Sequence, residues 1–81
     1  MNYKLRIEVS LKRGHVDPEG ETTKRLLKEL GYSVDKVNII KVYLLTLESK
    51  SRKESEKKAE EICKRLLVNP TKDDYSINII E

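Results

Sequence analysis

Apolar and polar residues alternate without interruption from Tyr3 to Leu11, near the start of the chain. Successive side chains of a β-strand point to opposite faces of a sheet. This segment therefore places all its apolar residues on one face and its charged or hydroxyl-bearing residues on the other. The pattern predicts a strand with one buried face and one solvent-exposed face.

A helix is expected after a short loop. Asp17 is a favoured N-cap residue, and Pro18 follows where the first helical position, which needs no N–H donor, would be. An apolar stripe at helical spacing comes next and consists of Thr23, Leu26, Leu27 and Leu30. Gly31 then provides a stop signal, and we expect the stripe to pack on the sheet.

A second alternating segment runs from Val37 to Leu47, and it is apolar on both faces. One phase is interrupted only by Lys41, which predicts one long strand with a local bend or bulge there. Lys41 has two interpretations, an edge lysine that opposes aggregation or a contact to a partner. The opposite phase carries Ile40, Val42 and Leu44. Such an apolar patch, facing away from the helices, needs a cover.

The last part of the chain predicts a second helix and a third strand. Ser51 and Glu54 have the spacing of a capping box, and an apolar stripe follows that includes Ala59 and Cys63 and ends before Asn69-Pro70. Alternation returns from Tyr75 to Ile79. The order strand-helix-strand-helix-strand predicts a single α+β domain over residues 1–81, a two-layer α/β sandwich with both helices on one face of a three-stranded sheet. Strand order and direction stay open, because the long middle segment also suits a split βαβ arrangement.

Composition narrows the classes of partner. Charged residues make up 38% of the 81 residues and hydrophobic residues 37%. We therefore expect a small core and a large fraction of the chain's surface exposed to solvent. The net charge is only +3 with both signs interspersed, which favours solvated helix faces over a nucleic-acid surface. No apolar run approaches the roughly 20 residues of a membrane span, and no signal peptide is recognised. We expect a cytoplasmic protein without membrane contact.

The sequence offers little catalytic chemistry. His15 is the one histidine and has no serine or cysteine that the sequence places beside it, and no glycine-rich phosphate loop is present. Cys63 falls within the apolar stripe of the second helix, where a free cysteine is usually a small buried hydrophobe. No cluster has the spacing of a metal site. We therefore expect no catalytic residue, no metal and no cofactor bound by this chain.

Three sequence blocks resemble one family. The segment from Leu11 to Gly20 resembles the LKxGVxDPxG segment of the PurS family, the small subunit of phosphoribosylformylglycinamidine synthase. The segment 62–70 with Asp73-Asp74-Tyr75 is similar to the family's CxxLLxNPxxEDY pattern, and Lys41 falls at the family's Gly-Lys pair. The chain departs from these patterns at His15, Ile40 and Thr71-Lys72.

The resemblance implies a noncatalytic subunit that pairs with itself, as a homodimer or a dimer of dimers, and bridges the synthetase PurL to the glutaminase PurQ. That ATP-dependent ligase complex, a glutamine amidotransferase, converts formylglycinamide ribonucleotide to formylglycinamidine ribonucleotide in purine biosynthesis. The residues expected to shape the partner interface are Lys12, Gly14, Asp17, Pro18, Gly20, Lys41, Asn69 and Pro70. Those expected to mediate self-association are Ile40, Val42 and Leu44.

Two alternatives of other classes stay open. A strand followed by Asp17-Pro18-Glu19-Gly20 and a helix superficially resembles the ligand-binding turn of an ACT-like small-molecule-sensing module, a fold that needs four strands. A nucleic-acid-binding module ranks third, on the strength of the basic pairs in the helices.

Overall fold

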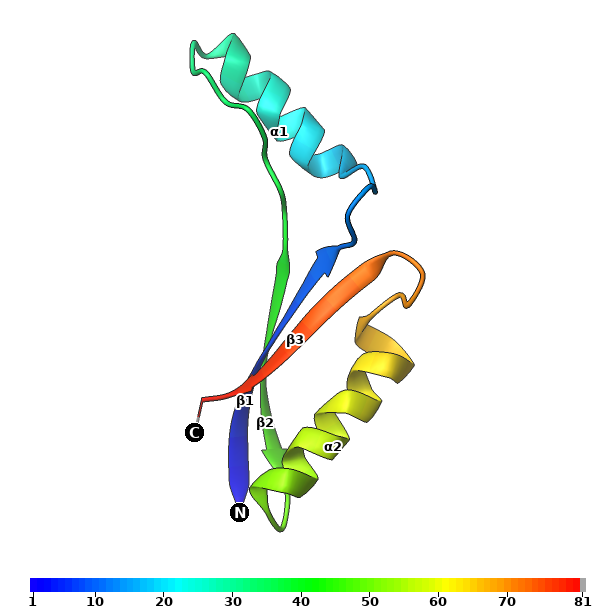
Figure 1. Ribbon diagram of the computed structural model, residues 1–81. Coiled ribbons are helices and arrows are strands. Elements are labelled where there is room, and N and C mark those ends of the chain that lie inside the picture. Colours follow the sequence, from blue (N-terminus) through cyan, green and yellow to red (C-terminus); the bar gives the residue numbers. More distant parts are fainter. Residues whose placement is uncertain (81) are drawn as a thin grey trace.

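The structure, a computed structural model, describes residues 1–80. Three strands form one antiparallel sheet in the order β2-β1-β3. The elements follow the expected order of strand, helix, strand, helix and strand (Figure 1), with these bounds: β1 Asn2–Leu11, α1 Pro18–Glu29, β2 Lys41–Glu48, α2 Arg52–Ile62, the π-helical stretch η1 Cys63–Leu67 and β3 Asp73–Ile79. The sheet and the element order expected from the sequence are therefore confirmed, and β1 is the central strand.

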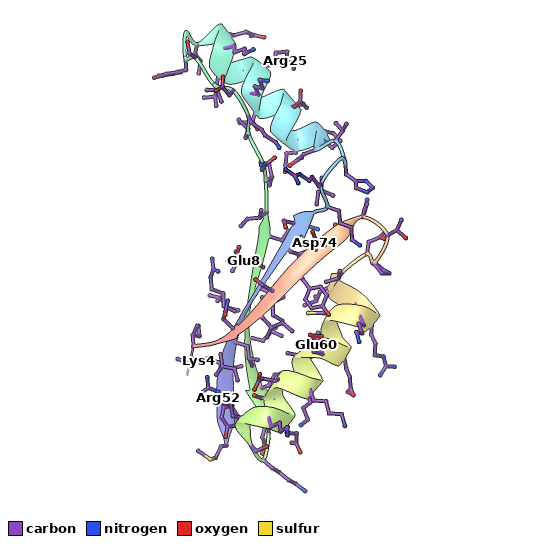
Figure 2. The ribbon with its side chains drawn as sticks, viewed as in Figure 1. Lys4, Glu8, Arg25, Arg52, Glu60 and Asp74 are labelled. Carbon is purple, nitrogen blue, oxygen red and sulfur yellow. The ribbon has the colours of Figure 1, made fainter. Side chains whose placement is uncertain are left out.

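The core lies between the sheet and α2. The inward residues of β1 supply its centre, with Leu5 and Ile7 fully buried, and α2 and η1 contribute Ala59 and Cys63, also fully buried. These are the residues that the strand and helix periodicities place on one face. Tyr75 of β3 packs against this core, and its hydroxyl donates a 2.8 Å hydrogen bond to Glu60 of α2, which faces the sheet in Figure 2.

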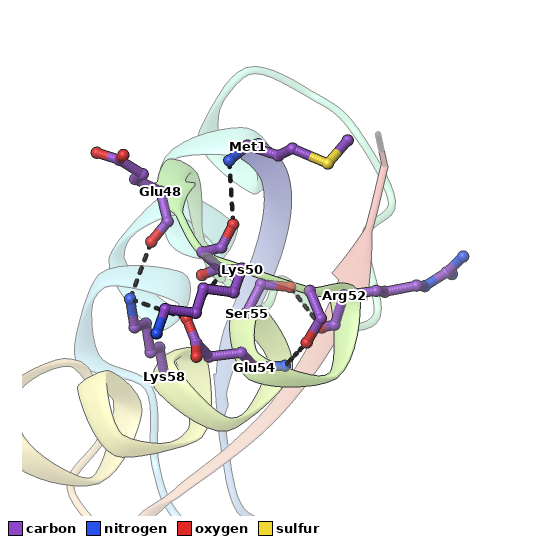
Figure 3. A network of polar contacts seen from close by, with 9 residues as sticks. Met1, Glu48, Lys50, Arg52, Glu54, Ser55 and Lys58 are labelled. Carbon is purple, nitrogen blue, oxygen red and sulfur yellow. Dashed lines mark hydrogen bonds and ion pairs between the residues drawn. The ribbon is translucent and has the colours of Figure 1, made fainter.

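Helix α2 begins where the capping signal predicts. The Ser51 Oγ accepts the N–H of Glu54 at 3.1 Å, and the Glu54 carboxylate accepts the N–H of Lys50 at 3.0 Å. Lys58 donates to the Glu48 carbonyl at 2.9 Å, and the Met1 ammonium group donates to the Ser49 carbonyl at 3.2 Å (Figure 3). These bonds tie the start of α2 to the adjoining ends of β1 and β2, so the sheet and α2 form one body.

Helix α1 does not pack on the sheet, so the prediction of two helices on one face is wrong for this helix. Figure 1 shows α1 standing beyond the end of the sheet, between a short loop that follows β1 and a long extended connection that leads to β2. Leu26 and Leu30 of its apolar stripe remain 49% and 72% exposed. The molecule measures 52 × 25 × 15 Å as a result. The physical reason is that α1 is anchored to its own returning connection, described below, rather than to the strands.

The long middle strand is shorter than expected. The β1–β2 ladder runs without a break from Asn2–Glu48 to Val9–Lys41, so the predicted bulge at Lys41 is absent from the described pairs. Lys41 is instead the first residue of β2, and residues 36–40 continue as an extended chain outside the ladder. The alternating pattern therefore predicts the extended backbone correctly, although pairing of this segment with β1 begins only at Lys41.

Candidate partner interface

The residues expected to contact partners gather at one end of the sheet. The end of β1 pairs there with the start of β3, as Leu11 with Asp73, and the start of β2 pairs through Lys41 with Val9. Lys12 follows directly, and its N–H donates to the Lys72 carbonyl at 2.7 Å. Figure 2 marks this end by Asp74, near the start of β3. The end of the sheet and the base of α1 together form one continuous surface.

Asp17 joins α1 to the segment that returns to the sheet. One carboxylate oxygen accepts the N–H of Gly20 at 2.9 Å, which confirms the predicted N-cap, and Pro18 is the first helical residue. The other oxygen accepts the N–H of Ile39 at 2.8 Å. The hydrogen bonds from Gly20 and then Ile39 lower the pKa of Asp17, because both stabilise the ionised carboxylate. The contact to Ile39 spans 22 positions, and no pattern in the sequence predicts it.

Gly20 allows a close approach of two backbones. It is buried, and a Cβ atom at this position would lie 2.2 Å from the Val37 carbonyl oxygen. Any larger residue must therefore push α1 away from the returning segment. The sequence motif singles out Gly20, whereas the reason for a glycine becomes visible only in the structure.

The two other motif loops are held by local bonds. Gly14 has a φ of 89°, in the left-handed region that glycine adopts readily, and the His15 N–H closes the turn on the Lys12 carbonyl at 3.2 Å. The Asn69 side chain accepts the N–H of Thr71 at 2.9 Å. The Asp73 carboxylate accepts the N–H of Asn69, also at 2.9 Å. Both loops are thus shaped by their own hydrogen bonds, and Pro70 is left exposed on the surface.

Two of the hollows that flank this end of the sheet adjoin Asp17. The larger, of about 550 Å³, lies between residues 10–17 and residues 36–40 and is lined by basic residues that include Lys12, Arg13 and Lys36. The smaller, of about 220 Å³, holds Lys41 together with Asp17, Glu19 and Asp73. Lys41 thus lies among carboxylates at the base of α1. Whether it also touches a partner stays a prediction.

The apolar patch expected on the far face of β2 is present. Val42 and Leu44 of β2 are 42% and 70% exposed and alternate with Tyr43 and Leu45, which pack against the core. Ile40, just before β2, is 45% exposed. The β1 neighbours of Val42 and Leu44 are charged, because Arg6 stands opposite Leu44, Glu8 stands opposite Val42, and the two form an ion pair. The patch is therefore a single apolar stripe beside a polar strand.

A further apolar surface was not anticipated from the sequence. This surface consists of Leu26 of α1, the C-cap residue Leu30 and Tyr32 just beyond it, which are all exposed, Tyr32 by 62%. The helical periodicity identified the stripe correctly but assigned it to the sheet of its own chain. No sequence pattern distinguishes a free stripe from a packed one. The contacts that position α1, from Asp17 to Ile39 and from Gly20 to Val37, are known only from the structure.

The described residues show neither a metal-binding cluster nor an activated thiol. No group of three or more histidine, cysteine or acidic residues within residues 1–80 is placed to hold a metal ion. Cys63 is buried, and this burial raises the pKa of its thiol, which disfavours the reactive thiolate. No helix of the described part of the chain is long and apolar enough to cross a membrane. The same part forms three strands rather than the four that an ACT-like module needs.

Comparisons with known proteins agree on one family. The family model of PurS, described as phosphoribosylformylglycinamidine (FGAM) synthase, matches residues 4–81. The PurS subunit of Archaeoglobus fulgidus is 43% identical over 72 residues, covering 88% of this chain and 90% of the relative. A solved PurS subunit of FGAM synthetase superposes with a TM-score of 0.90 at 34% identity, over 95% of this chain and 92% of the other.

A chain in the structure of PurLQS from Thermotoga maritima superposes with a TM-score of 0.88 at 30% identity, over 99% of both chains. The family model and the identities extend over nearly the whole chain, including the three sequence blocks. The chain therefore belongs to the PurS family of FGAM synthase subunits.

Proposed function

We propose that the chain is the noncatalytic assembly subunit of FGAM synthase and that it bridges the synthetase PurL to the glutaminase PurQ. The observation that carries this proposal is the gathering of the family's motif residues at the end of the sheet, in a chain whose described residues form no metal-binding cluster. The similarity to a chain of the PurLQS structure supports these two partners.

A bridging subunit has a clear purpose in this reaction. Ammonia released from glutamine at the glutaminase must reach the synthetase without escaping into water, so the two subunits must be held in a fixed relation. The body of sheet and α2, with α1 anchored on its connection by Asp17, supplies a stiff element for that purpose. ATP and glutamine are then handled by the larger subunits, and this chain binds no cofactor. The cytoplasm is the compartment in which we place the assembly.

Self-association completes the proposed assembly. A compact protein of this mass, 9.5 kDa, exposes about 5,000 Å², whereas the chain exposes 6443 Å². The excess of about 1,400 Å² exceeds the roughly 800 Å² that each partner buries in an interface of standard size. The radius of gyration of 16.2 Å likewise exceeds the roughly 12 Å of a compact domain of this length. Contact with a second copy would bury this excess surface area.

Two apolar surfaces are available to a second copy, the β2 stripe of Ile40, Val42 and Leu44 and the α1 stripe of Leu26 and Leu30. They lie on different parts of the molecule, as Figure 1 shows for β2 and α1. One surface suffices for a homodimer with a two-fold axis, and use of both permits a dimer of dimers.

Reconstitution tests the bridging role. Cognate PurL and PurQ are assayed with and without this chain, once with glutamine and once with added ammonium as the nitrogen source. We expect the glutamine-dependent rate to require the chain, while the ammonium-dependent rate depends on it much less, because free ammonia needs no bridge. Equal glutamine-dependent rates with and without the chain refute the proposal. The isolated chain is the control, and we expect neither glutaminase nor ATPase turnover from it.

A further inference from the structure

Strand β3, orange to red in Figure 1, forms one edge of the sheet, because among the described residues it pairs with β1 alone. In an antiparallel ladder, alternate residues point their N–H and C=O groups toward the neighbouring strand. The bond from the Ile80 N–H to the Lys4 carbonyl assigns that direction to the even-numbered residues. The main-chain groups of Tyr75, Ile77 and Ile79 therefore point away from β1, toward the outer edge.

This edge is open to pairing. Within residues 1–80, neither a loop nor a side chain supplies a hydrogen bond to the outward main-chain groups of residues 75–79. Free edges are usually blunted by charged residues, prolines or bulges, and this segment has no charge or proline and an unbroken ladder with β1. The opposite edge of the sheet differs, because β2 begins with Lys41 and its Glu48 carbonyl accepts a bond from Lys58.

The two faces of β3 define which strand would fit beside it. Tyr75, Ile77 and Ile79 pack against the core and are only half-buried, whereas Ser76 and Asn78 are exposed on the other face. Successive side chains of an added strand would meet these two faces in turn. Apolar side chains beside the isoleucines would complete their burial, and polar ones would lie beside Ser76 and Asn78. The edge therefore fits a segment in which apolar and polar residues alternate.

A hollow of about 410 Å³ lies where this edge begins. Its apolar lining consists of Val68, Pro70 and Tyr75, and the charged residues Lys12, Lys64, Asp73 and Asp74 complete it. Pro70 and Lys12 are also residues of the candidate partner interface, so the edge is continuous with that surface. The hollow provides a place for an apolar side chain at one end of an added strand.

We propose that the β3 edge binds an extended segment of a larger subunit of the synthase, with alternating apolar and polar residues. This inference rests on the assembly role proposed above and assigns that role a specific surface. Main-chain hydrogen bonds to the edge supply affinity, and the hollow supplies specificity. A second copy of this chain fits the apolar stripes of β2 and α1 better, because interfaces between copies are more apolar than the polar outer face of β3.

A proline on the edge tests the proposal in the reconstituted complex with PurL and PurQ. Ile77→Pro removes an outward N–H and leaves the bonds to β1 in place, which is where edge strands tolerate proline. Ile77→Ala is the matched control, since it truncates the same side chain and keeps the N–H. We expect the proline variant to raise the Kd of complex formation at least about tenfold above that of the alanine variant. Equal Kd values for the two variants overturn the proposal.

Residue-resolved hydrogen exchange of the unmodified chain keeps the test decisive if Ile77→Pro misfolds. In the chain alone, the amides of Ser76 and Asn78 are expected to exchange slowly, because they bond to β1, and those of Tyr75, Ile77 and Ile79 to exchange fast. In the complex with PurL and PurQ all five should exchange slowly.

Two results of the exchange experiment contradict the proposal. If the three outward amides are already equally protected in the self-associated chain alone, a second copy pairs with the edge. A chain that restores glutamine-dependent synthesis while these amides still exchange fast in the complex refutes the β3 edge and leaves the bridging role intact.

Discussion

Replacing Gly20 by alanine sets two opposite effects against each other in helix α1. Alanine is favoured over glycine within a helix by about 1 kcal/mol, so local propensity alone predicts a more stable α1. The new Cβ, however, would lie 2.2 Å from the Val37 carbonyl oxygen, well inside the 3.0 Å that real contacts respect. The neighbouring atom belongs to the backbone, which yields less readily than the end of a side chain. We expect overpacking, which costs about 1–3 kcal/mol, to outweigh the helical gain.

Thermal unfolding at a fixed protein concentration measures the net effect, because self-association makes the Tm concentration-dependent. Each kcal/mol of destabilisation lowers the Tm of a domain of this size by about 4–8 °C. Thr22→Ala, at an exposed position of the same helix, is the matched control, and we expect its Tm to stay within a few degrees of the unmodified chain. Hydrogen exchange at Ile39 adds a local readout, since the displaced helix weakens the bond to Asp17. A Gly20→Ala variant with an unchanged or higher Tm and a protected Ile39 amide would show that the close approach is unimportant.

Two other perturbations follow from the same structure. Hydrogen bonds from Gly20 and Ile39 lower the pKa of Asp17 below its ordinary 3.8. Its contribution to α1 is therefore complete above that value and is lost as the pH falls through the lowered one. Protection of the Ile39 amide should fall with acid in the unmodified chain and be low at every pH in Asp17→Asn, whereas identical profiles would exclude the anchor. Val42→Asp should shift sedimentation toward the monomer, because it buries like charges near a two-fold axis, while Lys57→Asp should not. A wild-type chain that is monomeric at micromolar concentration, or two variants that both associate like it, would exclude the β2 stripe as the interface.

The elements themselves could be predicted because their signals are local. Strict alternation around Leu5 and Ile7 marks β1, and the capping residues Asp17 and Ser51 mark the starts of the two helices. Each of these signals depends on residues within a few positions of one another, where backbone geometry alone decides which side chains share a face. The buried faces of β1 and α2 followed directly from it.

The position of α1 could not be predicted in the same way. A stripe containing Leu26 and Leu30 indicates that the helix has an apolar face, but it does not indicate which surface covers that face. The structure places α1 through the bond from Asp17 to Ile39 and the approach of Gly20 to Val37, contacts between residues about 20 positions apart. The motif residues of the candidate interface were therefore identified one by one, whereas their assembly at the end of the sheet depends on the tertiary structure.

The central claim is that this chain connects two larger subunits, and sedimentation of the mixture tests it most directly. Fluorescently labelled cognate PurQ is sedimented with PurL, under the conditions in which glutamine-dependent synthesis is measured, with and without this chain. The account predicts that labelled PurQ moves at the rate of the PurL complex when the chain is present and at its own slower rate when the chain is omitted. Co-sedimentation of PurQ with PurL to the same extent in both mixtures would contradict it.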